Sequence, residues 1–187
     1  MIIEKITLGG GCFWCIENIF NRVNGIVTVT SGYAAGDIIN PSYEEICRGT
    51  TNHAEVVDIE FDPEVVNLET ILTVFFGIHD PTTLNRQGND VGSHYRSIIL
   101  VRNDQQQAVA QKKIAELNNA DYLEDKSENK IVTEIKQFEQ FYSAESYHQG
   151  YVEDNPDSQY CQLVVAQKIQ KFLANFSHLL KDEKETI

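Results

Sequence analysis

Apolar positions along the chain follow two spacings, which together predict a mixture of strands and helices. Residues Ile2 to Leu8 are mostly apolar and β-branched, as in a strand, and Val57 to Phe61 alternate apolar and acidic residues, as in a strand with one buried face. From Phe13 to Val23 apolar residues recur at three- and four-residue steps, as in a helix. The same spacings predict further strands over 26–32, 95–101 and 131–135 and further helices over 68–78, 104–118 and 159–176.

Turn and cap residues mark the ends of several of these elements. Gly25 stands where a helix C-cap is expected, and Asn67 and Asp104 are placed to cap the helices that follow them. His79-Asp80-Pro81 ends the first of these two helices. In the last helix, the expected buried stripe consists of Leu163, Ala166, Ile169, Phe172 and Phe176.

Three longer stretches lack regular spacing. Residues 33–53 are polar and expected at the surface, 82–94 form a loop of a length that is often functional, and 138–160 carry many aromatic side chains. Strands and helices mix without strict alternation, and no repeat of about 20 to 50 residues is visible. We therefore predict an α+β fold, a two-layer α/β sandwich, with a single domain over 1–181 and a charged tail over 182–187.

The composition excludes some classes of function. A formal charge of −13 and a pI near 4.7, without any basic run, argue against nucleic-acid binding. Residues 1–11 contain Glu4 and lack a long apolar segment, and no apolar run reaches membrane-spanning length, so we expect no signal peptide, no membrane association and a cytoplasmic location. In that reducing compartment, cysteines are more often redox-active or nucleophilic than joined in structural disulfides.

Cys12 is the strongest candidate for a reactive group. It follows the glycine run Gly9 to Gly11, where a strand is expected to end and a helix to begin. The unpaired N–H groups and the positive end of a helix dipole favour an anion there, so we expect the pKa of Cys12 to be lowered. The alternative is a small buried thiol, which suits the adjoining glycines and aromatic residues less well.

Cys12 and Cys15 also form a C-x-x-C pair, which has two other interpretations. A zinc site is disfavoured because Cys47 and Cys161 are isolated and the histidines lack the usual spacing. A thioredoxin-like dithiol, using Cys12 and Cys15, remains an alternative.

Several short motifs, in this order, resemble the A-type peptide methionine sulfoxide reductases over most of the chain. They are Gly11-Cys12-Phe13-Trp14, Ser31-Gly32-Tyr33-Ala34, Pro41-Ser42-Tyr43-Glu44-Glu45, His53-Ala54-Glu55-Val56, His79-Asp80-Pro81-Thr82, Arg86-Gln87-Gly88-Asn89-Asp90-Val91-Gly92, Tyr95-Arg96-Ser97, Ala144-Glu145, Tyr147-His148-Gln149 and Tyr160-Cys161. The resemblance implies a ferredoxin-like core and a catalytic domain that reduces the S epimer of methionine sulfoxide, in oxidised proteins, peptides or the free amino acid. It further implies a role in protein repair under oxidative stress and thioredoxin as the reductant.

The chain departs from the family pattern in three places. Asn52 stands where the family usually has glycine before His-Ala-Glu, and Cys15 stands where many members have glycine. Cys161 precedes a predicted helix rather than a glycine-rich tail with another cysteine. The last two departures leave open whether Cys161 or Cys15 is the resolving thiol.

The resemblance also implies roles for individual residues. Cys12 is the nucleophile and Glu55 the acid that protonates the sulfoxide oxygen, since burial in an apolar pocket raises a carboxyl pKa. From the residues alone, Glu55 is expected to be a solvated strand carboxylate. Tyr43 and Tyr95 donate hydrogen bonds to the sulfoxide oxygen and Asp90 orders the site, although each also suits an ordinary surface, core or turn position.

The remaining candidates concern substrate binding and recycling. Phe13 and Trp14 are expected to hold the S-methyl group, and His53 and His148 to line or order the site. Attack by a second thiol on the Cys12 sulfenic acid gives a disulfide that thioredoxin reduces; we expect Cys161 to supply this thiol, because a Cys12–Cys15 bridge within one helical turn requires unwinding. Residues expected to serve packing or solvent contacts are Cys47, His79, His94 and His178.

Two other functions remain possible from the sequence. The C-x-x-C pair suits a dithiol oxidoreductase, which would require Cys15, and the aromatic residues suit a non-enzymatic module that binds methyl-thioether side chains without turnover. For the reductase we expect a monomer that needs no metal or organic cofactor, with thioredoxin or dithiothreitol as reductant.

Overall fold

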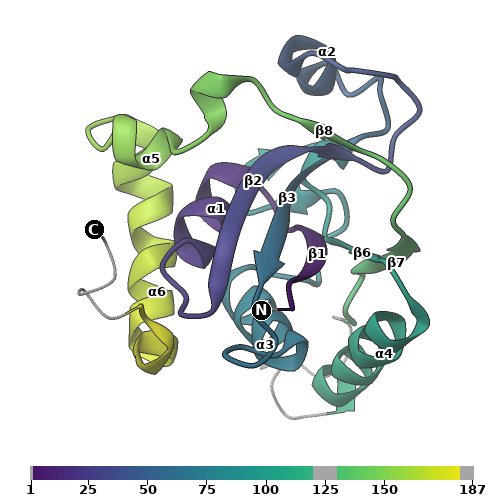
Figure 1. Ribbon diagram of the computed structural model, residues 1–187. Helices are drawn as coiled ribbons and strands as arrows, with labels where there is room; N and C mark the ends of the chain where they lie inside the picture. Colours follow the sequence, from purple (N-terminus) through teal and green to yellow (C-terminus); the bar gives the residue numbers. More distant parts are fainter. Residues whose placement is uncertain (1, 120–129, 182–187) are drawn as a thin grey trace.

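A six-stranded mixed sheet forms the centre of the molecule, in a computed structural model that describes residues 2–119 and 130–181 (Figure 1). The strand order is β7-β6-β1-β3-β2-β8, and neighbours are antiparallel except for β6 and β7. These strands are β1 (Glu4–Gly9), β2 (Ile26–Ala34), β3 (Ala54–Phe61), β6 (Ile98–Val101), β7 (Glu134–Gln137) and β8 (Phe141–Ser143). A separate hairpin is formed by β4 (Arg86–Gln87) and β5 (Asp90–Val91).

Helices pack around this sheet, with α6 against α1 and α3 (Figure 1). They are α1 (Phe13–Phe20), α2 (Tyr43–Cys47), α3 (Leu68–Ile78), α4 (Asp104–Asn119), α5 (Tyr151–Asp154) and α6 (Ala166–Phe176). A π-helical turn, Cys161–Val165, leads directly into α6, and short 3₁₀ turns cover Ser93–Tyr95, Ser146–His148 and Ser177–Leu179.

Side chains on the two faces of the sheet pack into two separate apolar clusters. Leu8 and Ile59 lie in the main core with the buried side chains of α1 and α3. Val56 and Leu100, which point to the opposite face, pack with Phe138 of the β7–β8 connection. Successive side chains of a strand alternate between faces, so a single strand such as β3 serves both clusters.

Most elements match those predicted from the spacing of apolar residues. Asn67 caps α3 as predicted, because its side chain accepts a hydrogen bond of 2.9 Å from the backbone N–H of Thr70. The predicted cap at Asp104 is wrong by one residue. Asn103 accepts from the N–H of Gln106 over 2.8 Å, and Asp104 is the first residue of α4.

The polar stretch 33–53 is more ordered than a surface loop. Tyr33 is fully buried at the end of β2, and α2 begins after Ser42 with a capping box in which Ser42 and Glu45 bond each other's backbone N–H. The Ser-x-x-Glu pattern that marks such a box is present in the sequence. The glycine and asparagine content of the stretch obscured it.

The expected stripe of the last helix is wrong in its first turn. Leu163 is 57% exposed, whereas Cys161 and Val165 are buried. The π-helical turn over 161–165 contains an extra residue, which shifts the side chains before α6 relative to a regular helix. From Ile169 to Phe176 the expected stripe is retained, with Phe172 fully buried.

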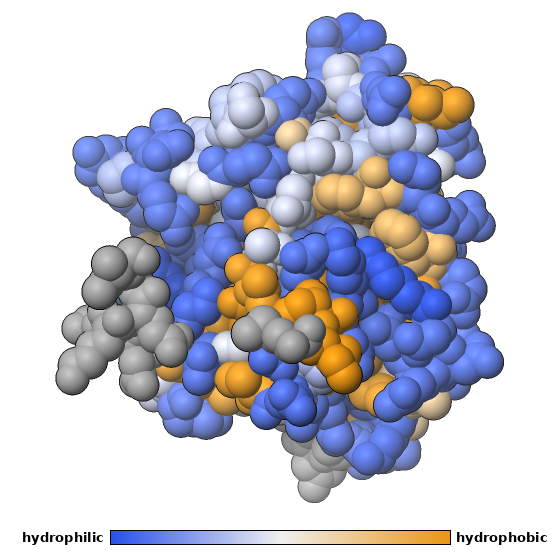
Figure 2. All heavy atoms as spheres, in the orientation of Figure 1, coloured by the Kyte–Doolittle hydropathy of each residue, from blue (hydrophilic) through white to orange (hydrophobic). Residues whose placement is uncertain are grey.

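The fold is thus of mixed α/β class in one domain, as predicted in outline, whereas the predicted two-layer arrangement stays a prediction. Residues 182–187 of the predicted tail lie outside the described residues. Over 2–119 and 130–181, no helix is both long and apolar enough to cross a membrane. Figure 2 shows hydrophobic atoms on the surface around the start of β1, where Ile2 and Ile3 are 70% and 37% exposed.

Candidate active site

Cys12 lies at the junction between β1 and α1 and is the N-cap residue of the helix. Its φ and ψ of −60° and 126° are extended, so Cys12 stands just outside the helical turn that begins at Phe13. Gly11 has φ 96°, a value that favours glycine and explains the glycine before the cysteine. The Cys12 side chain is 6% exposed.

Glu55 approaches this junction from β3. Its side chain is 1% exposed, and Oε2 accepts a hydrogen bond of 3.1 Å from the backbone N–H of Phe13, one of the otherwise unpaired donors of α1. Burial raises the pKa of Glu55 to about 8, against the opposing effect of the Phe13 N–H; the charges of Asp90 and Cys15 raise it further. Near neutral pH this carboxyl is therefore mostly protonated.

The pKa values of the two cysteines in the C-x-x-C pair are shifted in opposite directions. The pKa of Cys12 is raised well above its ordinary value, mainly by burial. A hydrogen bond with Cys15 and the charge of Glu55 make smaller contributions in the same direction. The prediction of a lowered pKa for Cys12 is wrong, because loss of solvent outweighs the helix N-terminus. The lowered value belongs to Cys15, whose pKa falls to about 7, first through the hydrogen bond with Cys12.

Aromatic side chains form a wall beside Cys12. Trp14 stacks on Tyr151 with ring centroids 3.7 Å apart and 7° between the planes, and its Nε1–H donates to Nδ1 of His148 over 3.0 Å. The Phe13 ring lies 5.1 Å from the ring of His148 and 5.7 Å from that of Tyr33. Phe13, Trp14 and His148 thus lie together, and their predicted roles in substrate binding stay predictions; Tyr151 was not singled out from the sequence.

Phenol groups and carboxylates complete the site. Burial raises the pKa values of Tyr43 and Tyr95; the charges of Glu55 and Cys12 contribute to both increases. The hydroxyl of Tyr160 donates to Asp90 Oδ2 over 2.8 Å and lies 4.0 Å from Cys15 Sγ.

Glu145 fixes the positions of two tyrosines in this region. It accepts from the Tyr33 hydroxyl over 2.9 Å and from the Tyr43 backbone N–H over 2.8 Å. Neither Glu145 nor Tyr160 was given a role from the sequence, although both occur in the motifs quoted above.

The other two cysteines occupy contrasting positions. Cys161 is 5% exposed at the first residue of the π-helical turn, directly after Tyr160, and its N–H donates to Ser158 Oγ over 3.2 Å. Cys47 is exposed on α2, where its thiol interacts with the Tyr43 hydroxyl. All four cysteines are free thiols.

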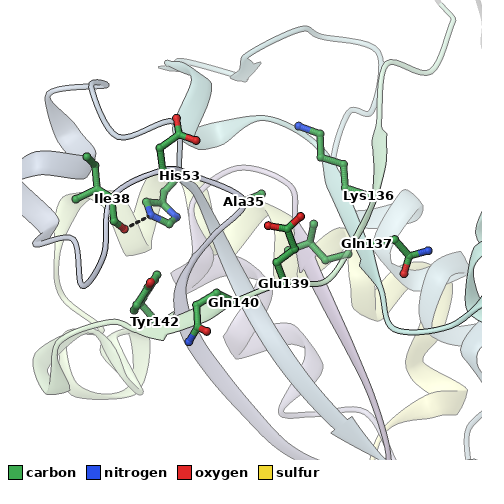
Figure 3. Close-up of a pocket in the computed structure, with 11 residues that line it drawn as sticks. Ala35, Ile38, His53, Lys136, Gln137, Glu139, Gln140 and Tyr142 are labelled. Atoms are coloured by element: carbon green, nitrogen blue, oxygen red, sulfur yellow. Dashed lines mark hydrogen bonds between the residues drawn. The ribbon is translucent and has the colours of Figure 1, made fainter.

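His53 lines a different pocket, shown in Figure 3. Its Nε2 bonds the carbonyl of Ile38 over 2.7 Å, and its ring lies 5.6 Å from Tyr142, edge to face. The pocket has a volume of about 390 Å³ and also contains Lys136 and Glu139. None of these contacts is with the thiols, and the predicted substrate-binding role of His53 stays a prediction.

Asn52, beside this histidine, has φ 58°. This is the left-handed region in which asparagine replaces glycine at small cost. His79 lies in the core, where its ring bonds the Phe75 carbonyl over 2.6 Å and Ser97 Oγ over 2.8 Å. In the described part of the chain, no three His, Cys, Asp or Glu side chains are grouped so that they could hold a metal ion.

Comparison with known proteins identifies the family. A family model described as peptide methionine sulfoxide reductase matches residues 4–180. The chain belongs to this family. A relative named peptide methionine sulfoxide reductase MsrA, from a Nitratiruptor species, is 53% identical over 178 residues, which cover 95% of this chain and 99% of the relative. The predicted reductase family is confirmed.

Solved structures with a similar fold are also found. Mxr1 from Saccharomyces cerevisiae in reduced form is 36% identical, with a TM-score of 0.75 over 85% of this chain and 89% of that one. The structure of Mxr1 in complex with Trx2 is also similar, at 28% identity and a TM-score of 0.53 over 80% of this chain and 84% of that one.

Proposed function

We propose that this chain reduces the S epimer of methionine sulfoxide to methionine, in oxidised proteins, peptides and the free amino acid. The observation that carries the proposal is the meeting of Cys12 with a protonated carboxyl at the start of α1, where Phe13 N–H binds Glu55. The names of the relatives support this substrate. A nucleophile beside an acid is what the reaction needs, because the sulfoxide oxygen leaves only when it is protonated.

In the first half-reaction, Cys12 sulfur attacks the sulfoxide sulfur while Glu55 gives its proton to the oxygen. The oxygen is transferred to Cys12, which is oxidised to a sulfenic acid, and the substrate sulfur is reduced to a thioether. The thiol proton replaces the one that Glu55 gave. Glu55 Oε2 already accepts from Phe13 N–H, so Oε1 is the atom that carries the transferable proton.

Tyr43 and Tyr95 are proposed to donate hydrogen bonds to the same oxygen. Their raised pKa values keep both phenols protonated, which a donor requires. Asp90 is held by Tyr160 and is proposed to order this side of the site. The substrate methyl group is proposed to pack on Phe13 and Trp14, since Trp14 is fixed by both His148 and Tyr151.

For the second half-reaction, we propose Cys15 as the resolving thiol in place of the expected Cys161, whose role stays a prediction. Cys12 has extended φ and ψ at the N-cap, so a Cys12–Cys15 bridge does not have to form between two fully helical residues. Cys15 also has a side-chain hydrogen bond with Cys12 and a pKa of about 7. Thioredoxin is the proposed reductant of the resulting disulfide, and the structure of Mxr1 with Trx2 supports it.

We also retain the ferredoxin-like core as a proposal. The order β6-β1-β3-β2, with α1 between β1 and β2 and α3 between β3 and β6, supports it. The proposed enzyme works as a monomer in the cytoplasm without metal or organic cofactor.

A stereochemically resolved assay tests the proposed function. The chain is supplied with each epimer of a methionine sulfoxide peptide and with dithiothreitol, and methionine is measured. Turnover of the S epimer alone is expected. Turnover of neither epimer, together with reduction of protein disulfides, would instead favour the dithiol oxidoreductase.

A further inference from the structure

Lys168 lies on the inward side of α6, which is unusual for a lysine. It is half-buried and stands three residues after Val165 and four before Phe172, both of which are fully buried. Side chains at these spacings share one face of a helix. The ammonium reaches the active-site junction: Nζ is 3.6 Å from the position that a Cβ on Gly11 would occupy.

Among the residues that the structure describes, this ammonium has no carboxylate partner. Within the described residues, no Asp or Glu oxygen lies within 4.0 Å of Lys168 Nζ, whereas Lys112 and Lys113 pair with Glu69 and Glu116. Partial burial of a charge without a partner is unfavourable, so a compensating negative charge is expected nearby.

Cys15 is a nearby group that can supply this charge as a thiolate, because, after the larger effects of the hydrogen bond with Cys12 and of burial, the charge of Lys168 lowers its pKa. The groups that act on or near the Cys15 thiol are Cys12 at the helix N-cap, Glu55 on β3, Asp90 on β5, Tyr160 before the π-helical turn, and Lys168 on α6. Lys168 is the one cation among them. It also faces His79, whose pKa falls to about 4, first through burial and with a contribution from Lys168, so this histidine is neutral near pH 7.

We propose that Lys168 is a positioning residue that holds Cys15 as a thiolate for attack on the oxidised Cys12. The inference rests on the proposed role of Cys15 as resolving thiol. In this step Cys15 sulfur attacks the sulfur of the Cys12 sulfenic acid, the S–S bond forms and the S–O bond breaks. The hydroxide takes up the proton that Cys15 had lost and leaves as water, so no further oxidant or reductant is needed.

The effect on rate is expected to be moderate and dependent on pH. Because the charge of Lys168 lowers the Cys15 pKa, loss of the ammonium should raise this pKa and reduce the thiolate fraction at pH 7. A more basic thiolate is a better nucleophile, by about threefold for each unit of pKa, so the rate at pH 7 should fall only roughly two- to threefold. At high pH the loss should disappear.

The experiment compares Lys168→Met with Lys168→Arg, which keeps the charge, and with Lys171→Met, which removes an exposed lysine of the same helix. Each protein is mixed with S-methionine sulfoxide without reductant over about pH 6 to 9. Methionine release reports the first half-reaction, and alkylation followed by peptide mapping reports formation of the Cys12–Cys15 disulfide.

Normal methionine release by Lys168→Met shows that the site is folded. We expect this variant to form the disulfide more slowly at pH 7 and with its pH midpoint shifted upward, whereas Lys168→Arg and Lys171→Met behave like wild type. An unchanged midpoint and rate in Lys168→Met would overturn the inference while leaving the role of Cys15 intact. Formation of a Cys12–Cys161 disulfide by the wild type would instead overturn the role of Cys15.

Discussion

The hydroxyl of Tyr160 connects Asp90 to Cys15, since it donates to Asp90 Oδ2 over 2.8 Å and lies 4.0 Å from Cys15 Sγ. Tyr160 also directly precedes Cys161 and the π-helical turn. Asp90 in turn raises the pKa of Glu55. The proposed acid and the proposed resolving thiol therefore belong to one electrostatic network, and the two half-reactions are best measured separately.

Replacement of Cys12 by serine should abolish reduction with every reductant, because the hydroxyl of serine is a far weaker nucleophile than a thiol in this setting. Methionine formation with dithiothreitol is the measurement. Cys47→Ser, which changes the exposed cysteine of α2, is the matched control and should retain activity. Substantial turnover by purified Cys12→Ser would exclude Cys12 as the nucleophile.

Glu55→Gln should slow the first half-reaction by about a hundredfold or more, since the amide cannot supply the proton. In the wild type, the single-turnover rate should fall as the pH rises through about 8, because Glu55 then loses its proton. Glu60→Gln, on the same strand, is the control. A near-normal rate for Glu55→Gln at neutral pH would show that another group is the acid.

Glu55→Gln should also stabilise the folded protein at alkaline pH. The pKa of Glu55 is raised from 4.5 to about 8 on folding, so between these values the native state holds a proton that the unfolded chain has released, and stability falls as pH rises. Glu55→Gln removes this dependence. Its free energy of unfolding, measured with denaturant, should exceed that of wild type by roughly a few kcal/mol at pH 8, with the difference shrinking toward pH 4.5. Equal pH dependence in both proteins would contradict the raised pKa.

Cys15→Ser should release about one equivalent of methionine per enzyme and then lose turnover with thioredoxin, because its sulfenic acid lacks the adjacent thiol. Cys161→Ser should retain thioredoxin turnover. Peptide mapping after one turnover without reductant should find Cys12 joined to Cys15. The reverse pattern, with a Cys12–Cys161 disulfide and loss of turnover in Cys161→Ser, would restore the expectation drawn from the family resemblance.

Regular apolar spacing was sufficient to predict most of the sheet and the helices, because burial of one face imposes that spacing. Short elements were harder. The helix after Ser42 has five residues, too few for a periodic pattern, and only its capping box is visible in the sequence. The π-helical turn left no signal that separates it from a regular helix, so Leu163 was expected inside and the inward position of Lys168 was missed.

The candidate residues of the site were identified largely from motifs. The pKa shifts of these residues could not be predicted in the same way. Helix-terminus reasoning assigned the lowered pKa to Cys12, but this thiol is buried beside Glu55 and its pKa is raised. The pKa of Cys15 depends on neighbouring Cys12 and also on Tyr160 and Lys168, which lie about 150 residues further along the chain. The contributions of Tyr160 and Lys168 cannot be read from the sequence around Cys15.

Because the cysteines differ in exposure, one of them can be labelled selectively. Cys47 is exposed on α2, whereas Cys12, Cys15 and Cys161 are buried. A bulky maleimide dye applied to the reduced enzyme should therefore attach to Cys47, one helical turn from Tyr43. Its fluorescence would report events at the proposed oxygen-binding side of the site, without any engineered cysteine.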